Sequence, residues 1–173
     1  MELLIQKVDQ KAVVPTKAYD TDSGFDLYAI NFKEFWERGG TNYERKRDEK
    51  YIKDRMIDNL DGRLPIGSQE RVLIDTGIMA TVGKGYEIQI RSRSGLALNQ
   101  GLSVLNSPGT CNEGYRNTIC VILQNNSGMT QKIKIGDRIA QLVVAKVELP
   151  EIKVVETLPA SERGPAGFGS TGR

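Results

Sequence analysis

One loop of the sequence carries residue types that could hold a small ligand and act on it. The stretch "NSPGTCNEGYRNTI", residues 106–119, is rich in turn-forming glycine, asparagine and proline, and Tyr115 follows three residues after Asn112. A tyrosine ring can pack flat against a ligand, and an asparagine amide can form hydrogen bonds. The amide cannot take up a proton, as a carboxylate at the same position could. The loop therefore predicts a binding site whose chemistry depends on position 112.

The side chains available for catalysis are limited. The chain has no histidine, and Cys111 and Cys120 are its only cysteines. This composition excludes Ser-His triads, histidine-based acid or base chemistry, most zinc enzymes and a disulfide framework. We interpret both cysteines as free thiols. Any catalysis must then use carboxylates, a tyrosine, a lysine or a hard metal ion.

Length and charge restrict the class of protein further. The chain has 173 residues, enough for one domain with its own core, and its 24 basic and 22 acidic residues nearly cancel. We therefore expect no nucleic-acid partner and no binding to a membrane surface. No apolar run approaches the roughly 18 residues that cross a bilayer, and the N-terminus does not resemble a signal peptide. We expect a cytoplasmic, intracellular protein, with a viral or phage origin left open.

The elements that must position the loop are predicted to be short strands. Segments rich in valine and isoleucine are separated by glycine, proline, asparagine and serine, as in "RVLIDTGIMATV", "YEIQIR" and "KIKIGDRIAQLVV". This pattern predicts an all-β protein, built as a jelly-roll-like sandwich or barrel. We expect a single β domain over residues 1–160.

Residues 31–65 depart from this pattern because they hold dense charge. Their apolar side chains recur at helical spacing: Tyr43, Tyr51, Ile52, Met56, Ile57 and Leu60. We expect an inserted helix over about 43–59, beginning near Thr41 or Asn42. It is either a surface helix that covers one edge of the β domain or a dedicated surface for a protein partner. We expect deletion of residues 31–65 to leave folding and ligand binding largely intact.

The C-terminal stretch, residues 161–173, reads "SERGPAGFGSTGR" and is dominated by glycine. It cannot form a stable helix or strand alone, so a disordered terminus is one interpretation. The other is a flexible arm that binds a nucleotide. A guanidinium for phosphate, an aromatic face for a base and hydroxyls for further phosphate oxygens are present in Arg163, Phe168, Ser170 and Thr171.

Five stretches in chain order resemble the five motifs of the trimeric dUTP diphosphatases (dUTPases): "DSGFDLYA", "RSGLA", "NSPGTCNEGYR", "GDRIAQLV" and "RGPAGFGSTG". The resemblance covers most of the chain outside residues 31–65, which the family commonly crosses with a short loop. It implies a jelly-roll-like subunit, a homotrimer with shared active sites, and an arm at 161–173 that closes over a neighbour's site. It also implies Mg²⁺-dependent hydrolysis of dUTP to dUMP and pyrophosphate by attack of water on the α-phosphorus.

The same resemblance assigns roles around the nucleoside. Asn106, near Gly109, would hold uracil together with the backbone of the loop. Tyr115 would lie against the deoxyribose and leave no room for a 2'-hydroxyl, while Phe168 would stack on uracil. Base selection would come from backbone groups in a slot too narrow for a 5-methyl group.

The phosphates are assigned to a second set of residues. Asp26 would support the water shell of the metal ion and a neighbouring arginine, or would stabilise a turn by pairing with Arg93. Gln141 is placed among both the catalytic and the substrate-binding residues. The resemblance assigns no role to Arg91. The expected phosphate contacts are Arg93, Ser94, Gly95, Gln141, Arg163, Gly169, Ser170 and Thr171.

Asn112 occupies the position of the family's catalytic aspartate. That aspartate accepts a hydrogen bond from the sugar 3'-hydroxyl and deprotonates the attacking water, and an amide keeps only the first task. We therefore expect hydrolysis to be slower by about 10²- to 10⁴-fold. Three explanations stay open: an engineered exchange, a natural dUTP-binding regulatory protein that acts through a partner, or another carboxylate, of which Glu113 is nearest in sequence. The related dCTP deaminases share the β architecture, but the tail favours a dUTPase.

Overall fold

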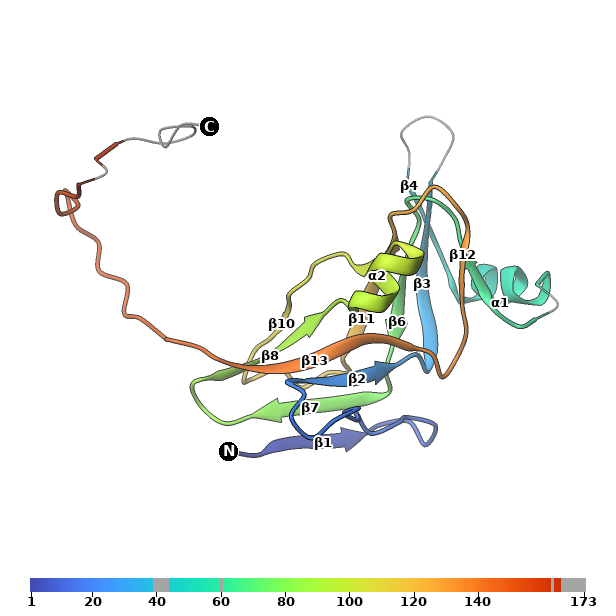
Figure 1. Ribbon diagram of the computed structural model, residues 1–173, viewed down its shortest axis with the longest axis horizontal. Coiled ribbons are helices and arrows are strands. Elements are labelled where there is room, and N and C mark those ends of the chain that lie inside the picture. Colours follow the sequence, from blue (N-terminus) through green and yellow to red (C-terminus); the bar gives the residue numbers. More distant parts are fainter. Residues whose placement is uncertain (39–43, 60, 163, 166–173) are drawn as a thin grey trace.

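The structure is a computed structural model that describes residues 1–38, 44–59, 61–162 and 164–165 (Figure 1). Strands dominate this part of the chain, and none of its helices is long and apolar enough to cross a membrane. The helices are α1 (Glu49–Ile57) and α2 (Ser94–Gln100). The strands are β1 (Leu3–Lys7), β2 (Gly24–Tyr28), β3 (Asn31–Arg38), β4 (Glu44–Arg47), β5 (Leu64–Ile66), β6 (Arg71–Asp75), β7 (Ile78–Val82), β8 (Tyr86–Arg91), β9 (Leu102–Val104), β10 (Gly109–Cys111), β11 (Cys120–Asn125), β12 (Gln131–Ile133) and β13 (Arg138–Lys146).

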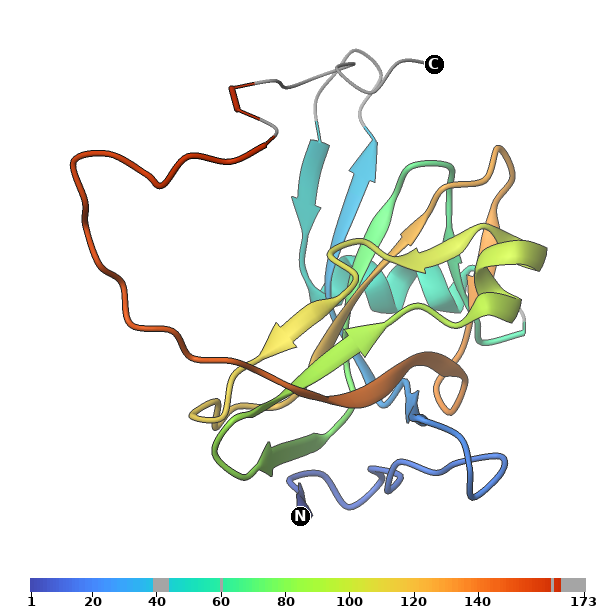
Figure 2. The ribbon, with the colours of Figure 1, turned by 60° about the vertical axis from the view of Figure 1, so that its left-hand side comes forward.

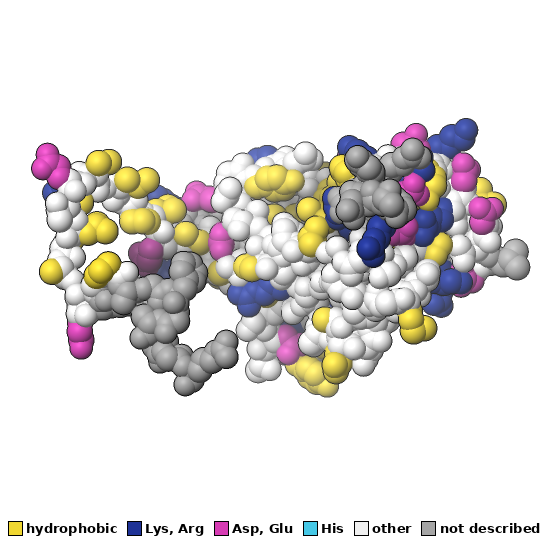
Figure 3. Space-filling model, turned by 90° about the horizontal axis from the view of Figure 1, so that it is seen from above, with side chains coloured by type: hydrophobic (Ala, Val, Ile, Leu, Met, Phe, Trp, Pro, Cys, Tyr) yellow, Lys and Arg dark blue, Asp and Glu magenta, His cyan; other side chains and the backbone are white. Residues whose placement is uncertain are grey.

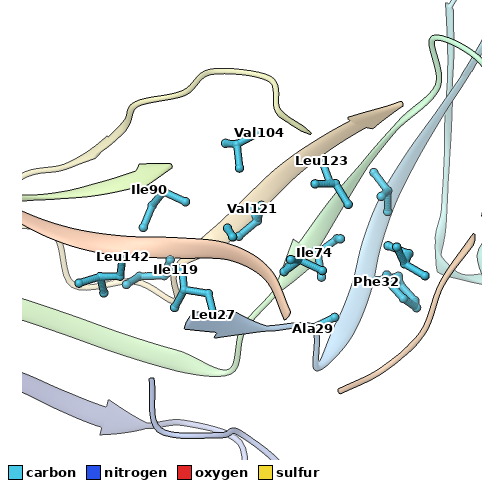
Figure 4. Close-up of a cluster of buried hydrophobic side chains, with 14 of the residues drawn as sticks. Leu27, Ala29, Phe32, Ile74, Ile90, Val104, Ile119, Val121, Leu123 and Leu142 are labelled. Carbon is cyan, nitrogen blue, oxygen red and sulfur yellow. The ribbon is translucent and has the colours of Figure 1, made fainter. Parts of the chain in front are cut away.

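Two antiparallel sheets enclose the core. One has the strand order β10-β8-β13-β2 and the other β4-β3-β6-β11-β9, while β1–β7 and β5–β12 form separate pairs. Figure 4 shows Leu27, Ile90 and Leu142 from the first sheet facing a common core with Ile74 and Val121 from the second. Burial alternates along β6, β8 and β11, so each of these strands turns one face to the core, whereas β13 is buried at Ile139 and Ala140 and again at Leu142 and Val143. The expected all-β, jelly-roll-like fold is confirmed.

The predicted helix over 43–59 is wrong at its start. α1 begins at Glu49, because the carboxylate of Asp48 accepts the backbone N–H of Tyr51 at 3.0 Å and caps the first turn. The preceding residues, Glu44–Arg47, pair with β3 as the edge strand β4. An edge strand made of charged residues has no apolar alternation to reveal it, and charge is how many edge strands avoid pairing with other chains. The suggested start at Thr41 or Asn42 lies outside the described residues.

Side chains of β3 and α1 belong to the core of the domain. Phe35 is fully buried on β3, and Ile52 of α1 is only 2% exposed. Arg55 of α1 lies over the Phe35 ring at 4.6 Å and forms an ion pair of 2.7 Å with Glu70, which is itself 9% exposed. Deleting residues 31–65 would remove a core strand and its packing. The structure therefore replaces the expected tolerance to deletion with an expected loss of folding.

The chain leaves the domain after β13. Figures 1 and 2 show that the segment after β13 runs away from the two sheets as extended chain without regular secondary structure. Ile152 and Val154 in this segment are 90% and 92% exposed. In Figure 3 apolar side chains line this extension, whereas mixed charges gather over the opposite end of the molecule. Such exposed apolar side chains in sequence are characteristic of surfaces that another chain covers.

Candidate functional site

A polar cleft of about 380 Å³ opens on the outer face of the β10-β8-β13-β2 sheet. It brings together side chains from β2, from the end of β8, from the start of α2 and from β13. We call it the arginine cleft. Its lining residues are Ala18, Asp22, Ser23, Gly24, Asp26, Arg91, Arg93, Ser94, Gly95, Arg138, Gln141 and Val143. Expected site residues from the first, second and fourth motif-like stretches thus share one cleft.

Asp26 is the centre of an ionic network in the arginine cleft. Arg93 Nε donates to Asp26 Oδ1 at 2.9 Å, and Arg138 Nη1 donates to Asp26 Oδ2 at 3.0 Å. Arg93 Nη1 also donates to the backbone carbonyl of Arg138 at 3.2 Å. The Asp26–Arg93 pair expected from the sequence is present, and a second guanidinium completes it. Both arginines are therefore fixed in direction by one carboxylate of which only 15% is exposed.

Gln141 lies beside this network because β13 pairs with both β2 and β8. The register places Gln141 opposite Asp26 on one side and opposite Arg91 on the other. Its amide Nε2 donates to the carbonyl of Ser92 at 2.9 Å. A Cβ atom on Gly24 would come within 2.2 Å of Gln141 Oε1, so only glycine leaves room for this amide.

Arg138 is a site residue that sequence reasoning missed. In a regular strand, residues three apart such as Arg138 and Gln141 point to opposite faces. An irregularity in the β13–β2 register between Arg138 and Ala140 removes this alternation, and both side chains line the arginine cleft. The available signal was weak, since it was only an arginine inside the motif-like stretch that contains Gln141.

The 106–119 loop is held mainly through its own backbone. Tyr115 N donates to the Asn112 carbonyl at 2.9 Å, and Tyr115 Oη donates to the Thr118 carbonyl at 3.0 Å. Burial raises the pKa of the Tyr115 phenol, so the phenol stays protonated and can donate. A Cβ on Gly109 would lie 3.0 Å from Asn106 Nδ2, which places the Asn106 amide against the start of β10.

Two further residues fix the tip of this loop. The Glu113 carbonyl accepts a hydrogen bond from Thr81 Oγ1 on β7 at 3.0 Å and another from Arg116 Nη1 at 2.6 Å. Arg116 Nη1 also donates to the Tyr115 carbonyl at 2.9 Å. Sequence reasoning missed both donors, because neither belongs to a ligand-binding residue pattern.

Asn112 lies apart from the arginine cleft. It lines a separate hollow of about 180 Å³ with Glu113 and Glu87, among others, and Glu87 was not anticipated from the sequence. β10 ends at Cys111, which pairs with Ile88 near the start of β8, whereas Arg93 follows the end of β8. At about 3.3 Å per residue, the extended chain from Glu87 to Arg93 spans roughly 20 Å. One copy of the chain therefore does not bring Asn112 to the arginine cleft, although Gly109 pairs with Ile90 close to Arg91.

The remaining expected site residues belong to the C-terminal tail. Their positions lie outside the residues that the structure describes: Arg163, Phe168, Gly169, Ser170 and Thr171. The roles expected for them from the sequence stay predictions.

Sequence comparison places the chain among known proteins. The sequence model of the dUTPase family matches residues 61–172. The chain is 39% identical over 173 residues to the deoxyuridine 5'-triphosphate nucleotidohydrolase of Nautilia profundicola, with 100% of both chains covered. It is also 39% identical over 172 residues to the protein of the same name from Helicobacter pylori, a match that covers 99% of this chain and 97% of that one.

Solved structures share the fold. The dUTPase of Staphylococcus bacteriophage 80alpha, solved with dUpNHpp, matches with a TM-score of 0.73 and 22% identity over 99% of both chains. A variant of the dUTPase from phage phi11 of S. aureus, solved with a structural Mg(II) ion, matches with a TM-score of 0.67 and 19% identity, covering 92% of this chain and 100% of that one. The family match and the full-length identities show that the chain belongs to the dUTPase family.

Proposed function

We propose that this chain binds dUTP and hydrolyses it, with Mg²⁺, to dUMP and pyrophosphate, and that Asn112 makes the hydrolysis slow. The observation that carries the proposal is the arginine cleft, in which Asp26 orients Arg93 and Arg138 beside Gln141. Oriented guanidiniums are the groups that bind phosphate oxygens most strongly in proteins. Family membership and the names of the 39% identical relatives support dUTP as the substrate.

The arginine cleft would hold the triphosphate. Arg93 and the polar groups of Ser94 and Gly95 would contact phosphate oxygens at the end of β8, with Gln141 beside them. Fixed donors that need no reorganisation can stabilise the charge that develops as water attacks the α-phosphorus. Asp26 acts here by orienting its two arginines rather than by touching the phosphates.

The chemistry of the cleft fits a magnesium ion that arrives on the phosphates. In the described residues no three acidic or cysteine side chains gather as a metal site, and both oxygens of Asp26 accept bonds from guanidiniums. Mg²⁺ commonly keeps several waters and binds through substrate phosphates with one or two carboxylates nearby. Asp26 would support that water shell, and the bound ion would neutralise charge on the phosphates.

The nucleoside would bind at the 106–119 loop of a different copy of the chain. Asn112 and Tyr115 follow Cys111, which pairs near the start of β8, whereas the arginine cleft lies at the end of β8. A site that contains both parts would therefore need residues from two subunits. The exposed apolar segment after β13 also favours packing on a neighbour. Both features support a homotrimer with shared active sites, in which the tail at 161–173 closes over a neighbouring subunit.

Position 112 favours a second candidate, a dUTP-binding regulatory protein that acts through a protein partner. The Asn112 amide can accept a hydrogen bond from the sugar 3'-hydroxyl but cannot deprotonate water. Glu113 and Glu87 line the same hollow and are the carboxylates available to replace it. The two candidates differ in whether bound dUTP is cut.

Turnover of dUTP by the unmodified chain and by Asn112→Asp tests the proposal. We expect release of pyrophosphate to rise by about 10²- to 10⁴-fold in the variant. Asn117→Asp is the matched control, because it adds a carboxylate to the same loop and should leave the rate unchanged. Calorimetry with dUpNHpp measures binding separately. Tight binding with no gain from Asn112→Asp would favour the regulatory candidate, and absence of binding would contradict both.

A further inference from the structure

The outer face of β8 carries a ladder of three side chains that ends in the arginine cleft. Ile88 and Ile90 point into the core, so Glu87, Gln89 and Arg91 share the opposite face. Gln89 Nε2 donates to Glu87 Oε1 at 2.7 Å. Arg91 Nε donates to Gln89 Oε1 at 2.9 Å, and Arg91 Nη2 donates to the same oxygen. The ladder therefore fixes the direction of the Arg91 guanidinium along the sheet.

Arg91 differs from the other two arginines of the cleft in its charge balance. Arg93 and Arg138 both pair with Asp26. Among the described residues, the hydrogen bonds of Arg91 go to the neutral amide of Gln89, which leaves its positive charge uncompensated. The other acidic residue in the cleft, Asp22, accepts the backbone N–H of Tyr19 at 3.0 Å.

From this arrangement we propose that Arg91 is an additional substrate-binding residue that contacts the phosphate chain beyond the α-phosphate. The proposal rests on the proposed function and extends it by one residue. Arg91 lines the same cleft as Arg93 and lies opposite Gln141 in the β13–β8 register. Gln89 engages only one side of its guanidinium, so Nη1 keeps donors for a ligand. The guanidinium thus contributes to the preference for dUTP over dUMP.

Affinity measurements on the full chain with dUpNHpp and with dUMP test this role. Arg91→Met should weaken dUpNHpp binding by about 10- to 100-fold, the range expected for a charge-assisted contact, and should change dUMP binding far less. Arg91→Lys keeps the charge and should recover part of the loss. Gln89→Leu keeps Arg91 but removes its orienting acceptor, and should give an intermediate loss.

Arg63→Met is the matched control, because it removes an exposed arginine outside the cleft and should leave both affinities unchanged. Unchanged dUpNHpp affinity in a folded Arg91→Met protein overturns the role of Arg91 alone. If Arg91→Met does not fold, Gln89→Leu decides, and parental affinity in that variant overturns the role. Failure of the unmodified chain to bind dUpNHpp overturns the proposed function as well.

Discussion

The segment from β3 to α1 and the 106–119 loop are held in the molecule by different kinds of contact. β3 and α1 are anchored by side chains, through buried Phe35 and Ile52 and through the Arg55–Glu70 ion pair. In the loop, Asn112 and Tyr115 are exposed, and hydrogen bonds to backbone carbonyls set its shape. The segment that carries no expected site residue is part of the core, whereas the loop that carries several presents Asn112 and Tyr115 at the surface.

This difference indicates which region contributes mainly to stability and which is suited to ligand binding. Buried side chains contribute to the free energy of unfolding in proportion to the packing that they lose on substitution. A loop held by its backbone can change side chains at low cost to stability, which suits a surface that binds a ligand. Substitutions in the two regions should therefore separate into effects on stability and effects on affinity.

The largest expected effect is on stability, from Phe35→Ala. Removing a fully buried aromatic ring from β3 should lower the free energy of unfolding by about 3–5 kcal/mol. Urea denaturation measures this directly. Ile57→Ala is the control in the same segment, because Ile57 is 75% exposed and its substitution should change stability by less than about 0.5 kcal/mol. If Phe35→Ala lowered the free energy of unfolding as little as Ile57→Ala, the segment would lie outside the core.

The ion pair between α1 and the turn before β6 should give the next largest effect. Arg55→Met leaves the Glu70 carboxylate without its guanidinium, although Gly67 N still donates to it. We expect the free energy of unfolding to fall by about 1.5–3 kcal/mol, since a mostly buried charged group loses its partner. Affinity for dUpNHpp should stay at the parental value. A weakened affinity in Arg55→Met would instead connect α1 to the ligand site.

The strands were largely predictable from sequence, because alternation of apolar residues is a local signal. The residues of the arginine cleft were expected only from the resemblance of three stretches, in chain order, to the motifs of one family. β4 was not predictable, since an all-charged edge strand has the composition of a helix surface. Arg138 was hidden by the irregular register of β13, which strand periodicity cannot reveal. The separation of Asn112 from Arg93 depends on how β10 pairs along β8, and that register is a property of the folded sheet.

The loop itself should respond in affinity rather than stability. Thr81→Val keeps a β-branched side chain on β7 but removes the hydroxyl that donates to the Glu113 carbonyl. One neutral hydrogen bond corresponds to about 0.5–1.5 kcal/mol, so the cost of ordering a loosened loop tip should weaken dUpNHpp binding by at most roughly 10-fold. Thr110→Val is the matched control, because Thr110 is the exposed residue of β10, and it should bind as the parent does. A parental affinity in Thr81→Val would show that Arg116 alone fixes the loop tip.

The smallest expected effect is a pH dependence of stability at Tyr51. Burial, followed by the hydrogen bond of the phenol to Glu37, raises the pKa of Tyr51 above its ordinary value of 10.0 in the folded protein. The folded state thus binds the phenolic proton more tightly than the unfolded state does. The resulting stabilisation is fully present below pH 10 and is lost as the pH rises through the higher folded value. Tyr51→Phe should therefore lose less stability than the parent as the pH rises above 10, as measured by urea denaturation at each pH. Tyr115→Phe removes a phenol whose pKa is also raised by burial, but at the surface loop. If Tyr115→Phe reduces the loss of stability at alkaline pH and Tyr51→Phe does not, the hydrogen bond from the Tyr51 phenol to Glu37 is not the cause of this pH dependence.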